Sequence, residues 1–99
     1  MNKITRKGIT YYPVGRWETY QHVFYNANDR AILALYDAEE SGDVDAMEKA
    51  DDWMEIVQRM LTKWNFNPRV NGIVYAEYKD YKVMKDIIGG YAARHGGTV

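Results

Sequence analysis

The sequence predicts an α+β fold, in which a helical hairpin and a C-terminal helix pack on a small antiparallel sheet. Apolar residues recur at helical spacing over residues 29–64 and again over 80–95, which indicates amphipathic helices. Strand-forming residues flank Asn71-Gly72, a dipeptide typical of a two-residue β-hairpin turn. Because the chain has only 99 residues, we expect one small domain over residues 1–99.

Residues 1–15 are expected to be an N-terminal strand region, because β-branched residues and tyrosines dominate it. Lys7-Gly8 either turns a short hairpin or places a bulge in one strand. Pro13 has no backbone N–H to donate, so we expect it at a strand end or on an edge strand.

Residues 16–28 are compatible with a helix or a strand, since their aromatic residues fit helical spacing and their composition also suits a sheet. Asn28 is well placed as a helix N-cap, so a helix is expected from about Asp29 to Glu40. Gly42 suits the end of that helix, and the helical hairpin is expected to span residues 29–64.

The stretch from Ser41 to Trp64 predicts the longest helix, with Ser41 or Asp43 as its N-cap. At about 100° per residue its apolar side chains cover roughly half of the circumference, more than a surface helix needs. This apolar stripe consists of Met47, Ala50, Trp53, Met54, Val57, Met60, Leu61 and Trp64.

Carboxylates gather on the other side of the same predicted helix. They are Asp45, Glu48, Asp51, Asp52 and Glu55. Acids near a helix N-terminus are stabilised by the macrodipole, but that effect fades before Asp51. Like charges four residues apart, such as Glu48 with Asp52, destabilise a helix by a few tenths of a kcal/mol. These carboxylates are therefore either a merely solvated face or a functional acidic surface.

The near-neutral net charge hides a segregation of charge along the chain. Residues 37–55 contain nine acidic residues and one basic residue, a net charge of −8, whereas the rest of the chain carries +7. Segregated charge points to oriented electrostatic contact with a partner.

Residues 65–79 are expected to form a β-hairpin around Asn71-Gly72, with Asn67-Pro68 ending the long helix. A last helix is expected over residues 80–95, with Asp80 as its N-cap. Gly89-Gly90 weakens this helix, so the helix either breaks there or lets another backbone approach closely.

No motif predicts catalysis, a cofactor or a metal site. The chain has no cysteine, its two histidines lack partners at metal-ligand spacing, and its acidic run lacks the pattern of a calcium loop. Ser41, the one serine, is explained by capping. No signal peptide or long apolar run is present, so we expect a cytoplasmic protein without a membrane span.

We therefore expect a non-enzymatic protein-binding module. Its partner would be a basic protein surface, such as that of a nucleic-acid-binding protein, engaged through Asp45, Glu48, Asp51, Asp52 and Glu55 with Trp53 as an apolar anchor. In character, though in no motif, the chain resembles inhibitors carried by phages and mobile elements. The breadth of the apolar stripe also predicts a homodimer through helices.

Two alternatives remain open. Basic residues interleave with aromatic residues towards both termini, for example Lys82 with Tyr78 and Tyr81, and such residues suit phosphate contact and base stacking. Direct nucleic-acid binding is thus a competing prediction, weakened by the acidic segment. A small enzyme or ligand-binding subunit would instead need a deep pocket with a buried carboxylate or His22.

Overall fold

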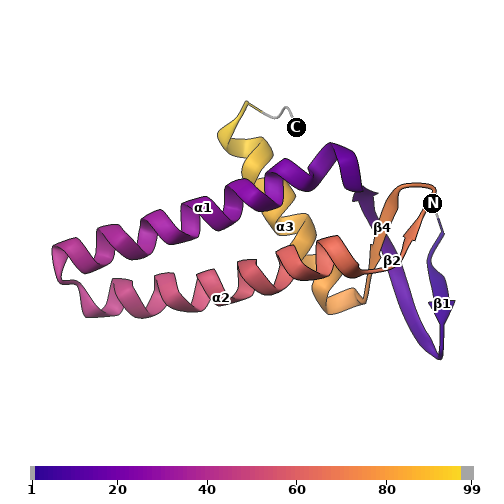
Figure 1. The fold of residues 1–99 in the computed structure, drawn as a ribbon, viewed down its shortest axis with the longest axis horizontal. Helices are drawn as coiled ribbons and strands as arrows, with labels where there is room; N and C mark the ends of the chain where they lie inside the picture. Colours follow the sequence, from indigo (N-terminus) through magenta and orange to yellow (C-terminus); the bar gives the residue numbers. More distant parts are fainter. Residues whose placement is uncertain (1, 97–99) are drawn as a thin grey trace.

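A computed structural model describes residues 2–96 and confirms the α+β fold. The elements follow in the order β1 (Ile4–Arg6), β2 (Ile9–Arg16), α1 (Trp17–Ser41), α2 (Val44–Phe66), β3 (Arg69–Val70), β4 (Ile73–Ala76) and α3 (Tyr78–Arg94). The antiparallel helices α1 and α2 form a long hairpin, with the sheet at one end of it and α3 crossing it (Figure 1).

The strands form one antiparallel sheet in the order β1-β2-β4-β3. Lys7-Gly8 and Asn71-Gly72 are the two hairpin turns, and all four residues have positive φ, from 52° to 80°. Turns with two successive positive φ angles match the twist of the strands that they join. Both hairpins follow from these local signals, and the hairpin alternative at Lys7-Gly8 is the correct one.

Pro13 lies within β2, an interior strand, but β1 pairs only with Ile9–Tyr11, so the β1 side of β2 is an unpaired edge at Pro13, in line with the expectation. The register shifts between Pro13 and Gly15, so Val14 is an inserted residue in a β-bulge. The Tyr75 N–H opposite Pro13 donates to the Pro68 carbonyl on the far side of β4, so the missing N–H of Pro13 falls on the unpaired side of β2 and costs the ladder no hydrogen bond.

Helix α1 begins at Trp17, so the hairpin extends well beyond the expected start at residue 29. Arg16 makes no side-chain cap; instead the backbone N–H of Trp17 donates to the Gly72 carbonyl at 2.8 Å. A carbonyl from the β3–β4 turn thus accepts from a first-turn N–H, which usually needs a cap. Asn28 is consequently no N-cap: it lies inside α1, and its side-chain Oδ1 is buried.

Helix α2 begins at Val44, and of the two expected N-cap candidates Asp43 is the N-cap. With 23 residues it is shorter than α1, which has 25, so the expectation that it is the longest helix is wrong. The Asp43 Oδ1 accepts from the Ala46 N–H at 3.1 Å. Ser41 is the last residue of α1, and its hydroxyl donates to the Ala38 carbonyl at 3.1 Å. Gly42 joins the helices with φ 69°, the left-handed conformation that glycine adopts readily.

Helix α3 begins before Asp80, so Asp80 is not its N-cap either. Asp80 lies in the first turn, is buried, and pairs with the Lys63 ammonium of α2. The helix continues unbroken through Gly89-Gly90. A Cβ on Gly89 would contact nothing within 4 Å, so no other backbone approaches there.

The core lies where the base of the helical hairpin, α3 and the sheet meet. Phe24 of α1 stacks on Trp64 of α2 with ring centroids 4.4 Å apart, and both side chains are fully buried. Val74 and Ala76 of β4 belong to the same cluster, as does Met84 of α3. This cluster joins every layer of the fold.

The other end of the hairpin projects from this core as an arm, which we define as residues 29–55 (Figure 1). Its buried apolar residues are three alanines, Ala31, Ala38 and Ala50. The molecule measures 46 × 31 × 17 Å, and its radius of gyration of 14.9 Å exceeds the value of about 13 Å typical of this length. The fold is therefore elongated along the arm.

Candidate functional site

All five predicted carboxylates lie on the exposed face of α2 within the arm, and we call them the acidic ridge. They are Asp45, Glu48, Asp51, Asp52 and Glu55, and each side chain is exposed. Helix α2 packs mainly against α1, and its buried residues Ala50 and Val57 lie on the side opposite the carboxylates. Since the apolar stripe fixes the rotation of the helix, the carboxylates must face away from α1.

Charge on the acidic ridge is not compensated within the part of the chain that the structure describes. The one ion pair found in residues 2–96 joins Lys63 to Asp80, outside the arm. The arm holds ten acidic and two basic residues, a net charge of −8, and the remaining residues carry +7. Because the arm is one end of an elongated molecule, the segregation seen along the sequence becomes a segregation in space.

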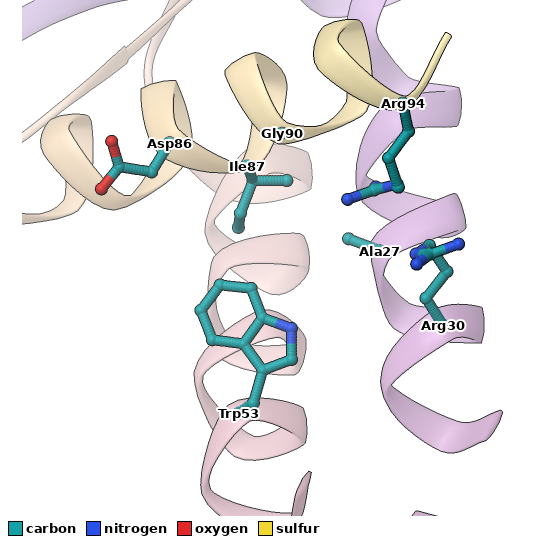
Figure 2. A pocket seen from close by; sticks show the side chains of 7 residues that line it. All are labelled: Ala27, Arg30, Trp53, Asp86, Ile87, Gly90 and Arg94. Atoms are coloured by element: carbon teal, nitrogen blue, oxygen red, sulfur yellow. The ribbon is translucent and has the colours of Figure 1, made fainter. Parts of the chain in front are cut away.

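Trp53 is separated from the acidic ridge. It is 42% exposed, but it lines a hollow with Ala27 of α1 and Ile87 of α3 (Figure 2). At about 100° per residue, Trp53 falls with Val57 and Met60 on the apolar side of α2 and not with the carboxylates. The structure thus brings the five acids together and leaves the predicted aromatic anchor on another side.

Val44 is an apolar neighbour of the acidic ridge that the sequence pattern did not single out. It is the first residue of α2, is 62% exposed, and by helical spacing lies on the same side as Asp51 and Glu55. Helical spacing places Val44 beside the carboxylates, but a single valine next to the N-cap is not a distinctive signal in the sequence. It offers an apolar contact at the tip of the arm.

A second surface combines aromatic and basic residues at the opposite end of the molecule. Tyr12 of β2 lies 5.4 Å from Tyr78 and 5.9 Å from Tyr81 of α3, measured between ring centroids. The Lys82 ammonium lies 5.4 Å from the Tyr78 ring centroid, and Tyr78 is 56% exposed. The fold therefore joins the aromatic residues of the two chain ends into one cluster.

The residues that would support a catalytic or metal site are spread out. His22 is exposed and its ring meets the Tyr91 ring edge-on at 5.3 Å. Asp80 is the one buried carboxylate among residues 2–96, and it is held by Lys63. In the same residues, no three histidine or carboxylate side chains gather closely enough to ligate a metal ion.

Comparison of the chain with protein-family models, curated proteins and solved structures finds no match. In the described residues 2–96, none of the helices combines the length and the apolar character needed to cross a bilayer.

Proposed function

We propose that this chain is a non-enzymatic protein-binding module that engages a basic protein surface through the acidic ridge. The observation that carries the proposal is the set of five exposed carboxylates, all on one face of a projecting arm and without basic partners in residues 2–96. Like charges on one helix face lower the stability of the helix slightly. A cationic partner would offset this repulsion when it binds.

The arm geometry supports this proposal. Because the arm projects from the core, a partner can approach the ridge without contacting the sheet (Figure 1). Carboxylates at helical spacing can follow a groove that otherwise accepts phosphates, so a nucleic-acid-binding protein is a suitable partner. An inhibitor that occupies such a groove, of the kind found in phages and mobile elements, is the specific form of this proposal.

Charge reversal on the ridge tests the proposal. Asp51→Lys with Glu55→Lys raises the net charge by four, and so does the control pair Glu18→Lys with Asp86→Lys off the ridge. Capture from a native lysate, quantified by mass spectrometry, should yield a basic protein that binds wild type and the control pair. The variant with Asp51→Lys and Glu55→Lys should bind that protein at least tenfold more weakly, which corresponds to a loss of about 1.4 kcal/mol of binding free energy.

Equal losses in both pairs would show that net charge, not the ridge, controls capture. Retention by the ridge pair, or capture that is insensitive to salt, would contradict the proposal, since exposed charge contacts are screened by salt. All variants should keep the circular dichroism of wild type, because the four substituted side chains are exposed.

Direct nucleic-acid binding is the second candidate, and the cluster of Tyr12, Tyr78 and Tyr81 favours it. Tyr78 is exposed and lies beside Lys82, while Tyr12 and Tyr81 are half-buried, and such rings beside a lysine suit stacking on single-stranded bases. Fluorescence anisotropy with labelled single and double strands should then show affinity that falls steeply with salt. Tyr78→Ala should weaken single-strand binding by about 1–3 kcal/mol. Absence of salt-dependent binding would remove this candidate.

We also propose that two copies associate through α1. The apolar stripe of α2 is largely covered, so the larger apolar exposure lies on the arm part of α1, at Leu33 (59%) and Tyr36 (60%) with half-buried Ile32 beside them. An isologous contact would bury this strip against itself. Light scattering should show a dimer at micromolar concentration that Leu33→Lys converts to a monomer. A wild-type monomer under these conditions would exclude the contact.

A further inference from the structure

The three helices meet around a hollow of about 120 Å³ at the base of the arm (Figure 2). Ala27 and Ile87, both buried, and the bare backbone of Gly90 line it together with the Trp53 indole. Ligand pockets for whole small molecules usually hold about 300–1,000 Å³, so this hollow suits a group of a few atoms.

Two arginines from different helices supply the charge of the hollow. Arg30 of α1 and Arg94 of α3 point into the space beside Ala27 (Figure 2). Within residues 2–96 neither guanidinium forms an ion pair, since the one pair found there is Lys63–Asp80. Guanidinium groups that converge without a carboxylate repel each other, and a bound anion would remove that repulsion.

The other lining groups are consistent with an anion at the arginine end. Asp86 also lines the hollow, but its carboxylate points away from the arginines (Figure 2). A Cβ on Gly90 would lie 3.5 Å from Arg94 Nη1, so the guanidinium folds back over this glycine. The glycine thus leaves Arg94 room beside the backbone, at a position where a larger side chain would fill part of the hollow.

We propose that this hollow binds a small oxyanion, a carboxylate or phosphate group, between the guanidinium groups of Arg30 and Arg94. Guanidinium forks donate parallel N–H bonds to both kinds of group, and charge-assisted bonds of this kind are strong. The buried residues Ala27 and Ile87 form an apolar floor below the anion, and the Trp53 indole lines another side. The site is independent of the acidic ridge, because neither arginine belongs to the ridge.

Titration calorimetry of the whole chain with sodium phosphate and with sodium acetate tests the site, at an ionic strength held constant with sodium chloride. At least one of the two anions should bind saturably. Tighter binding of phosphate would indicate a phosphate ligand, and tighter binding of acetate a carboxylate ligand. Arg30→Gln and Arg94→Gln should each weaken binding about tenfold or more, as loss of a charged hydrogen bond does. Asp86→Asn should strengthen it by removing a nearby negative charge.

Arg6→Gln removes the same charge from β1 and serves as the matched control, which should leave the isotherm unchanged. The tryptophan fluorescence of the wild type should change when the anion binds. This change should be absent in Trp53→Phe, in which calorimetry should still detect binding. Absence of saturable binding by both anions would overturn the proposal. Equal weakening by Arg6→Gln would also overturn it, because the effect would then follow net charge alone.

Discussion

Gly15 is a residue whose identity is dictated by a single neighbour. A Cβ at this position would lie 2.5 Å from Cε2 and 2.7 Å from Cδ2 of Tyr20, closer than real Cβ contacts. The Cδ2–Cε2 edge of the Tyr20 ring, on the first turn of α1, therefore lies against the strand at the bulge. Only a residue without a side chain allows α1 to begin so close to β2.

We expect Gly15→Ala to destabilise the protein by about 1–3 kcal/mol, the usual effect of overpacking. Urea denaturation should measure the loss. Gly89→Ala is the control, because nothing lies within 4 Å of its added Cβ and alanine favours a helix by about 1 kcal/mol. A Tyr20→Leu background should reduce the effect of Gly15→Ala, and an undiminished effect there would show that the ring is not the cause.

At the scale of single elements, the turns could be predicted from the sequence and the start of α1 could not. The Asn71-Gly72 and Lys7-Gly8 turns depend on the φ preferences of the turn residues themselves, so sequence suffices for them. The start of α1 does not, because its first N–H is satisfied by the Gly72 carbonyl, from a turn far away in sequence. Because no side chain caps α1, the sequence of residues 16–28 does not indicate where the helix begins.

The N-cap of α2 is a local feature, and a pair of substitutions distinguishes its two candidates. Asp43→Ala should destabilise the protein by about 1 kcal/mol, because the Ala46 N–H loses its acceptor. Ser41→Ala should change stability less, since the Ser41 hydroxyl only adds a donor to the Ala38 carbonyl. Thermal unfolding followed by circular dichroism compares the two, and a larger effect of Ser41→Ala would contradict this assignment.

At the scale of the whole molecule, the sequence predicted the charge pattern but not which groups would converge in space. The acidic ridge follows from helical spacing alone, and its five residues share one exposed face as expected. Arg30 and Arg94 lie far apart in sequence, and only the crossing of α3 over the hairpin brings them to one hollow. The same holds for Tyr12 with Tyr78.

The arm should be less stable than the core against local opening. Its buried apolar residues are alanines, whereas the core holds Trp64, Phe24 and Met60, so opening the arm exposes less apolar surface. Amide hydrogen exchange should therefore be faster at Leu35 and Lys49 than at Val57 and Trp64. Uniform protection along α2 would show instead that the hairpin opens only with the whole fold.

The opposite charges at the two ends of this 46 Å molecule give it a large permanent electric moment. In a field that varies over such a length, the chain experiences a torque as well as a force. Near a cationic surface at low salt it would turn with the helical tip first, and near an anionic surface it would turn with the sheet first. Its orientation is thus selected before any contact is made.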